Sequence, residues 1–118
     1  YGEELALCQR YYYTLINGNG QSIPIGAYYR STVITTSVQF PVSMRTLPSL
    51  IQTTGTSYYG LYSNNGLDVF NGFSSIARAS TECCTLDSSG LAASGVQGYA
   101  GSMKSNNAAS YIAFDAEL

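Results

Sequence analysis

Short runs in which apolar and polar residues alternate recur along the whole chain, separated by turn-forming residues. Successive side chains of a β-strand point to opposite faces, so this period of two predicts strands. The stretch VITTSVQF (33–40) places four residues on one face: Ile34, Thr36, Val38 and Phe40. The stretch ASYIAFDAEL (109–118) has two faces, with Ile112, Phe114, Ala116 and Leu118 on one and Tyr111, Ala113, Asp115 and Glu117 on the other. We expect both apolar faces to point into one core.

Seven further segments also read as strands: 8–16, 23–29, 50–54, 57–63, 67–73, 75–86 and 96–105. Turns rich in Asn, Gly or Ser are predicted at 17–20, 64–66, 87–90 and 106–108. Residues 2–9 are expected to hold one short helical turn, and residues 41–49 a loop bounded by prolines, which cannot donate to a strand ladder. Eight or nine short strands in one domain, residues 1–118, predict an all-β sandwich or jelly roll. An immunoglobulin-type sandwich is the alternative topology, but the chain has no Trp for the Cys–Trp–Cys spacing of that fold.

The charge of the chain excludes one class of partner. Five basic and seven acidic residues give a net charge of −2, and the basic residues are scattered along the sequence. A nucleic-acid-binding protein needs a basic surface against the phosphates, so nucleic acid is discarded as a partner. No apolar run approaches the ~18 residues of a membrane span, so no membrane insertion is expected, and no signal peptide is recognised. Because the first residue is Tyr1 rather than Met, we expect a fragment of a longer protein.

The side chains available predict neither metal chemistry nor catalysis. The cysteine count is odd, and we expect reduced, buried thiols at Cys8, Cys83 and Cys84 rather than disulfides. With no histidine and no C-x-x-C pattern, we expect no metal site and no cofactor. The histidine base of a Ser-His-Asp triad is also missing, and no two carboxylates form a recognisable glycosidase motif. We therefore expect that the chain is not an enzyme.

The three consecutive tyrosines Tyr11, Tyr12 and Tyr13 cannot all face the same way in a strand. Tyrosine is rigid and amphipathic, so it suits a protein core, a subunit interface and a glycan-binding site. For these three residues we expect the core or a subunit interface, with the odd ring facing another subunit.

A carbohydrate site is expected where an outward tyrosine lies near short polar groups, because sugars stack on rings and hydrogen-bond through their hydroxyls. In residues 23–30 the alternation is read as Ile25, Ala27 and Tyr29 inward, with Tyr28 and Arg30 outward. In residues 57–63, Tyr59 and Leu61 share one face, and Tyr58 and Tyr62 share the other. The candidate ligand-binding residues are therefore Tyr28, Arg30, Tyr58, Tyr62, Asp68 and Asn71, with Asn64 and Asn65 in the turn beside them.

Three phrases occur in order along the chain: GEELALCQRYY (2–12), FPVSMRTLPS (40–49) and AFDAEL (113–118). Together they make the chain resemble the C-terminal domains of bacteriophage tail fibres and tailspikes. The resemblance implies a jelly-roll β-sandwich that assembles as a homotrimer at the tip of the virion tail, after synthesis in the bacterial cytoplasm. It also implies non-catalytic recognition of cell-surface carbohydrate. The family's patterned positions, which we take to define the fold, are Glu4, Cys8, Arg10, Tyr11, Met44, Arg45 and Pro48.

Two hypotheses of different classes follow from the sequence. The first is a carbohydrate-binding module that recognises a neutral or weakly charged glycan of the host surface. The alternative is a purely structural trimerisation cap with no ligand. The first requires exposed rings beside polar groups, whereas the second requires those rings to be buried between subunits.

Overall fold

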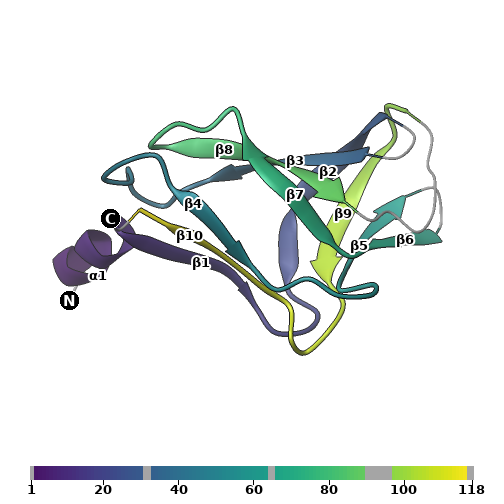
Figure 1. Cartoon of the computed structure of the whole chain (residues 1–118), viewed down its shortest axis with the longest axis horizontal. Helices are drawn as coiled ribbons and strands as arrows, with labels where there is room; N and C mark the ends of the chain where they lie inside the picture. Colours follow the sequence, from purple (N-terminus) through teal and green to yellow (C-terminus); the bar gives the residue numbers. More distant parts are fainter. Residues whose placement is uncertain (1, 31–32, 64–65, 90–96, 117–118) are drawn as a thin grey trace.

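The computed structural model describes residues 2–30, 33–63, 66–89 and 97–116. Within them the chain forms one helix and ten strands, and every strand pairing is antiparallel, so the all-β prediction is confirmed (Figure 1). The elements are α1 (Gly2–Gln9), β1 (Tyr12–Asn17), β2 (Ser22–Arg30), β3 (Val33–Gln39), β4 (Ser49–Gln52), β5 (Tyr59–Ser63), β6 (Gly66–Phe70), β7 (Gly72–Ala77), β8 (Cys83–Ser89), β9 (Ala100–Ser105) and β10 (Tyr111–Asp115).

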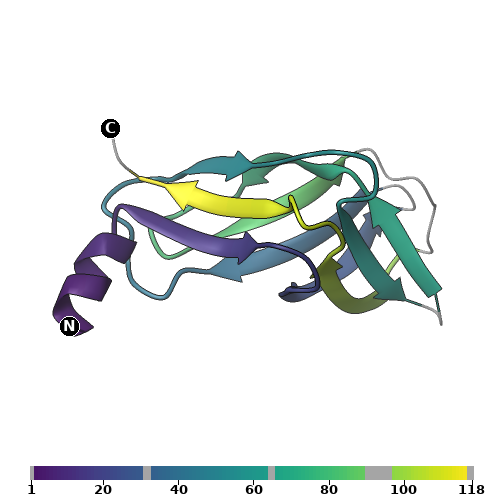
Figure 2. The same ribbon diagram turned by 90° about the horizontal axis from the view of Figure 1, so that it is seen from below.

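The strands form a sandwich-like pair of sheets. The smaller sheet has the order β1-β10-β4, and the larger has the order β6-β5-β9-β2-β3-β8-β7. Figure 2 shows β1, β10 and β4 side by side, with the strands of the larger sheet behind them. The predicted turns at 17–20 and 106–108 are confirmed. Of the turn predicted at 64–66, Asn64 and Asn65 lie outside the described residues, and Gly66 begins β6. The turn predicted at 87–90 is wrong for residues 87–89, which continue β8, and Gly90 lies outside the described residues.

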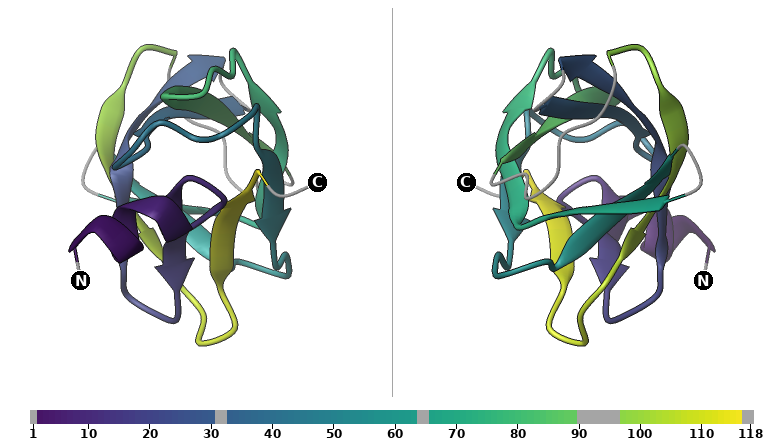
Figure 3. Two further views of the ribbon diagram at one scale, coloured as in Figure 1. Left: turned by 90° about the vertical axis from the view of Figure 1, so that its left-hand side faces the viewer. Right: turned by 90° about the vertical axis from the view of Figure 1, so that its right-hand side faces the viewer.

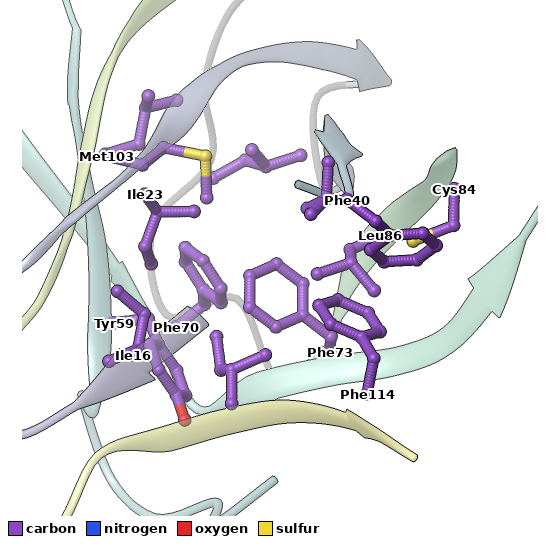
Figure 4. Close-up of a cluster of buried hydrophobic side chains, with 14 of the residues drawn as sticks. Ile16, Ile23, Phe40, Tyr59, Phe70, Phe73, Cys84, Leu86, Met103 and Phe114 are labelled. Atoms are coloured by element: carbon purple, nitrogen blue, oxygen red, sulfur yellow. The ribbon is translucent and has the colours of Figure 1, made fainter. Parts of the chain in front are cut away.

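Both strand faces predicted as core are confirmed. Ile34, Thr36, Val38 and Phe40 are all buried, and so are Ile112, Phe114 and Ala116, while Glu117 and Leu118 lie outside the described residues. Figure 4 shows the aromatic centre of this core, where Phe70, Phe73 and Tyr59 pack together. The ring centroids of Phe70 and Phe73 are 5.3 Å apart. The two sheets therefore share one hydrophobic core, as expected for a chain of this length.

Two segments that read as single strands are each broken in the structure. Residues 67–73 divide between β6 and β7, which form the two opposite edges of the larger sheet although only Asn71 separates them. The sheet must curl for these edges to meet, and Figure 3 shows the strands arranged around a central core. Residues 75–86 are broken by a turn in which Arg78 has a positive φ of 46°. Strand breaks of this kind leave little trace in the alternation of apolar and polar residues.

Two glutamine side chains act as bridges beside the strands. The Gln52 side chain on β4 accepts a hydrogen bond from the Phe73 N–H at 2.9 Å and donates one to the Phe73 carbonyl, which joins the edges of the two sheets. The Gln21 side chain makes the same two-way pairing with the backbone of Asn17. Each amide reproduces the donor and acceptor pattern of a neighbouring strand, so backbone groups that would otherwise lack a partner are satisfied.

The facing predicted for residues 23–30 is wrong at Ile25, Tyr28 and Tyr29, whereas Arg30 is exposed as predicted. Tyr28 is 2% exposed and points into the core, whereas Ile25 is 73% exposed and Tyr29 57% exposed. The cause is a bulge in β2, where the pairing with β9 shifts between Ile23 and Gly26. An extra residue in one strand reverses the facing of the residues that follow it, here as far as Tyr29. A second shift, in the pairing of β2 with β3, lies between Tyr28 and Arg30. The bulge is stabilised by the buried Thr36, whose hydroxyl contacts the carbonyls of Pro24 and Ile25 at 2.9 and 3.1 Å.

The three segments that carry the resemblance meet at one end of the sandwich. The Arg45 N–H donates to the Arg10 carbonyl at 2.8 Å, and the Ala116 N–H donates to the Tyr11 carbonyl at 2.8 Å. The Arg45 guanidinium also donates to the Ala116 carbonyl at 3.1 Å. Met44 and Pro48 are buried, whereas Glu4 and Cys8 are exposed on α1. The patterned positions outside α1 thus hold this end together, while the two on the helix do not contribute to the core.

The tyrosine cluster divides among three environments. Tyr13 packs against the core, with its ring centroid 6.4 Å from those of both Phe40 and Phe114. Tyr12 lies on the opposite face of β1, and Tyr11 is 40% exposed beneath the Arg45 guanidinium. The expectation of a core position is confirmed for Tyr13, and a subunit contact of the other two rings stays a prediction.

Candidate functional site

Tyr28 and Asp68 meet on the inner side of the larger sheet. The Tyr28 hydroxyl donates a hydrogen bond to the Asp68 carboxylate across the two strands that lie between β2 and β6. Asp68 pairs with the buried Leu61, so its carboxylate points inward from an edge strand. An inward charge on an edge strand discourages pairing with another chain. Both residues therefore have a structural role, and Tyr28, being buried, presents no ring to a ligand.

Tyr58 and Asn71 lie together in the loops before β5 and after β6. The Tyr58 ring is partly buried against Gly55, whose added Cβ would lie 2.5 Å from it. The Asn71 side-chain oxygen accepts a hydrogen bond from the Ser57 N–H at 3.2 Å, and its carbonyl accepts one from Gly55. These contacts fix the loop that leads into β5. They leave part of the Tyr58 ring accessible, and the polar side chains beside it, Asn71, Asn106 and Ser110, are hydrogen-bonded to the backbone of Ser57 and Tyr58.

Tyr62 is the predicted site residue that the structure presents most openly as a ring. It is 49% exposed on the outer face of β5, as the alternation predicted. The Lys104 ammonium lies 5.7 Å from the centroid of this ring. The exposed Ser102 pairs directly with Tyr62 across the two strands. A ring, a cation and a hydroxyl thus share one surface.

Arg30 forms a second ring–cation pair, with Tyr29. The alternation of residues 23–30 predicted that the Tyr29 ring points into the core. The Arg30 guanidinium lies 5.5 Å from the centroid of the Tyr29 ring, on the outer side of β2. Pro24 is the feature of the sequence from which the outward position of Tyr29 could have been predicted. Within a sheet, proline is confined to edge strands, strand starts and bulges, and β2 is a central strand. A bulge at Pro24 would have turned Tyr29 outward.

The two ring–cation pairs lie on one face of the larger sheet. On β9 and β2, Ser102, Ala100 and Ala27 lie between Tyr62 and Tyr29, and Ala100 pairs with Ala27. Two strand spacings across and four residues along place the two tyrosine Cα atoms roughly 16 Å apart. We call the set Tyr29, Arg30, Tyr62, Ser102 and Lys104 the outer tyrosine surface. It joins two of the six predicted residues, Arg30 and Tyr62, and leaves out the other four: Tyr28, Tyr58, Asp68 and Asn71.

A separate hollow of about 530 Å³ lies between α1 and the loop after β3. It is lined by Glu3, Ala6, Leu7, Arg10, Val42 and Ser43. None of the predicted ligand-binding residues borders it. It reflects the loose packing of α1, none of whose residues is buried.

The cysteines are free, but only one is buried as predicted. Cys84 lies in the core, where burial, together with the neighbouring Cys83, raises the pKa of its thiol to about 12. Cys8 and Cys83 are exposed. Because the Cys84 thiol stays protonated at neutral pH, it serves packing rather than chemistry.

The described ranges contain no group of three or more His, Cys, Asp or Glu side chains placed to hold a metal ion. Among the same residues, no helix has both the length and the apolar character needed to cross a membrane. Comparisons with protein-family models, with curated proteins and with solved structures gave no match.

Proposed function

We propose that this chain is a non-catalytic carbohydrate-binding module of a phage tail fibre or tailspike, which recognises a glycan of the host cell surface. The observation that carries the proposal is the outer tyrosine surface, with two rings about half exposed, each beside a cation, on one sheet face. Rings of this kind stack on the apolar side of a sugar, while the cations and Ser102 offer partners to its hydroxyls. The resemblance of residues 2–12, 40–49 and 113–118 to tail-fibre domains supports the same assignment.

The proposal includes a sandwich of jelly-roll type and a homotrimer on the virion tail. The small side chains between the rings and the distance of roughly 16 Å between Tyr29 and Tyr62 suit a short oligosaccharide lying across the strands. No charge change accompanies stacking and hydroxyl bonding, so affinity should depend weakly on salt. Each site is expected to be weak, and three sites in one particle multiply the affinity through avidity.

The binding prediction is tested with variants that remove one ring each. Tyr29→Ala and Tyr62→Ala are expected to weaken binding of a responsive glycan about fivefold each, since aromatic stacking is worth on the order of 1 kcal/mol. Isothermal titration calorimetry measures the affinity, after a glycan array has identified the ligand. Tyr11→Ala is the matched control, because Tyr11 is 40% exposed with Arg45 5.6 Å from its ring centroid but lies at the other end of the sandwich. Wild-type affinity in both test variants would place the site elsewhere.

The oligomer gives a separate prediction. Light scattering at micromolar concentration is expected to give three times the 12.6 kDa mass of the chain. Leu7→Ser on α1 is expected to lower that mass, because Leu7 is 56% exposed on a helix that buries none of its residues. Eight-residue helices are marginal in water and gain stability from packing partners. A monomer mass for the unaltered chain would remove the avidity argument.

The second candidate function is the structural cap, and α1 is the observation that favours it. Leu5 and Leu7 are both about half exposed there, beside the hollow described above. Exposed apolar side chains gathered at one end are typical of an assembly surface. A trimer that binds no glycan at millimolar concentration would make the cap the better account.

A further inference from the structure

The outer face of the smaller sheet carries two tyrosine rings joined through their hydroxyls. Tyr12 on β1 pairs with Asp115, and Tyr111 on β10 pairs with Asn17, so the two tyrosines stand four residues apart along the sheet. Four residues of a strand span roughly 13 Å. Even so, the two hydroxyl oxygens are 2.6 Å apart. The side chains can meet in this way only by lying along the sheet and pointing toward each other.

The burial of Ala113 supports this arrangement. Ala113 lies between the two tyrosines on the outer face, because its neighbours Ile112 and Phe114 point into the core. Yet Ala113 is 0% exposed. Thr14 of β1 and Ile51 of β4 flank Ala113 on this face, and the joined hydroxyls of Tyr12 and Tyr111 lie along the same face. Tyr12 and Tyr111 are each partly exposed, as expected of rings that lie along the sheet with one side toward solvent.

Polar groups surround these rings. The Thr14 hydroxyl lies 3.4 Å from the Tyr111 hydroxyl, and the exposed Asn17 is the direct neighbour of Tyr111 on β1. Asp115, partly exposed, is the direct neighbour of Tyr12. Only one large apolar side chain of this face is exposed in the described strands, Ile51 at 40%. Two flat rings in tandem, edged by hydroxyl, amide and carboxylate groups, match the alternation of apolar and polar surface on a sugar chain.

We propose that Tyr12 and Tyr111 form a second carbohydrate-binding surface, which takes two consecutive sugar residues of an extended glycan by stacking. Thr14, Asn17 and Asp115 hydrogen-bond the hydroxyls at the edges of the rings. The hydroxyl–hydroxyl bond fixes both rings before binding, so little side-chain entropy is lost when the glycan docks. The ligand class rests on the proposed function, but this surface lies on a different sheet from the outer tyrosine surface.

The chemistry of this face favours a glycan over a second copy of the chain. Stable protein interfaces bury about 800 Å² on each partner around a core depleted of charge. Here the centre is a pair of phenol hydroxyls surrounded by Thr14, Asn17 and Asp115, and Ile51 is the one large apolar side chain exposed beside them in the described strands. Rings that lie flat offer a plane for stacking but do not project into a pocket of a partner protein.

The test maps binding residue by residue in the intact protein. Cellohexaose, chitohexaose and maltohexaose are titrated separately, at millimolar concentrations, into isotopically labelled protein, and backbone amide shifts are followed by NMR. We expect at least one of the three to shift the amides of Tyr12, Thr14, Tyr111 and Ala113. Tyr12→Ala and Tyr111→Ala should each weaken that response about tenfold. Tyr12→Phe keeps the ring but removes the hydroxyl, and it should retain most of the affinity. This variant therefore distinguishes binding by ring stacking from a purely structural role of the bond between the two hydroxyls.

The outcomes separate this inference from the proposed function. Shifts confined to β5, β9 and β2 would overturn the second surface and leave the outer tyrosine surface standing. Shifts confined to β1 and β10 would support the second surface and would contradict the proposed site on the outer tyrosine surface. If dilution without sugar moves the amides of residues 12–17, the face is an interface between copies and the inference is wrong. No response of these amides to any of the three sugars would also overturn it.

Discussion

Replacing Phe114 with Ala is expected to lower the free energy of unfolding by about 3–5 kcal/mol. Phe114 is 0% exposed on β10, the central strand of the smaller sheet. Its ring centroid lies 5.0 Å from that of Phe40 and 6.4 Å from that of Tyr13, so the ring links β1 to the chain that follows β3. The substitution removes these aromatic contacts and leaves a cavity that the surrounding strands cannot close, because the two strands that pair with β10 hold its walls in register.

Urea denaturation followed by far-ultraviolet circular dichroism measures this loss. Ile25→Ala serves as the control, because Ile25 is 73% exposed and should change stability by less than about 0.5 kcal/mol. A loss near zero for Phe114→Ala would mean that the last strand faces the other way. That result would also remove the second carbohydrate surface, since Tyr12 and Tyr111 lie outward only if Phe114 points inward.

The sequence correctly predicted which side chains point into the core wherever a strand is regular. In β3 every second residue is apolar or Thr, and Thr36 at a buried position uses its hydroxyl on the carbonyls of the β2 bulge. The same reasoning failed in β2, because alternation carries no record of an inserted residue. The error exchanged the roles of Tyr28 and Tyr29, and with them the identity of the exposed ring. Pro24 in the middle of the strand was the available warning.

Other features depend on contacts between residues far apart in the sequence. The joined rings of Tyr12 and Tyr111 are separated by 99 residues, so their contact depends on the pairing of β1 with β10. The curl that brings β6 and β7 together is likewise a property of the whole sheet. The alternation of the last strand places Tyr111 on the face opposite the core residues, but it does not show that Tyr111 and Tyr12 meet. Candidate binding residues chosen from one strand at a time therefore included only Arg30 and Tyr62 of the outer tyrosine surface, and no residue of the face that carries Tyr12 and Tyr111.

The close approach of β9 to β5 leads to the second large effect. Gly101 on β9 has no room for a side chain, since an added Cβ would lie 1.7 Å from the carbonyl oxygen of Tyr62. The obstacle is backbone, which cannot rotate away, so Gly101→Ala must push the two strands apart. Overpacking typically costs about 1–3 kcal/mol, and we expect at least the upper value here. Because Tyr62 sits at the point of contact, the outer tyrosine surface should be distorted as well.

Gly26 provides a matched comparison, because it pairs directly with Gly101 on the neighbouring strand. An added Cβ at Gly26 would lie 2.2 Å from the Met103 sulfur, the flexible part of a side chain that can move. We therefore expect Gly26→Ala to cost about 1 kcal/mol, less than Gly101→Ala, when both are measured by urea denaturation. Calorimetry should show that Gly101→Ala loses glycan affinity at the Tyr62 surface, while NMR shifts at Tyr12 and Tyr111 stay as in the unaltered chain. Equal stability of the two variants would show that β9 does not approach the β5 backbone this closely. Unchanged affinity in a destabilised Gly101→Ala variant would instead separate Tyr62 from the binding site.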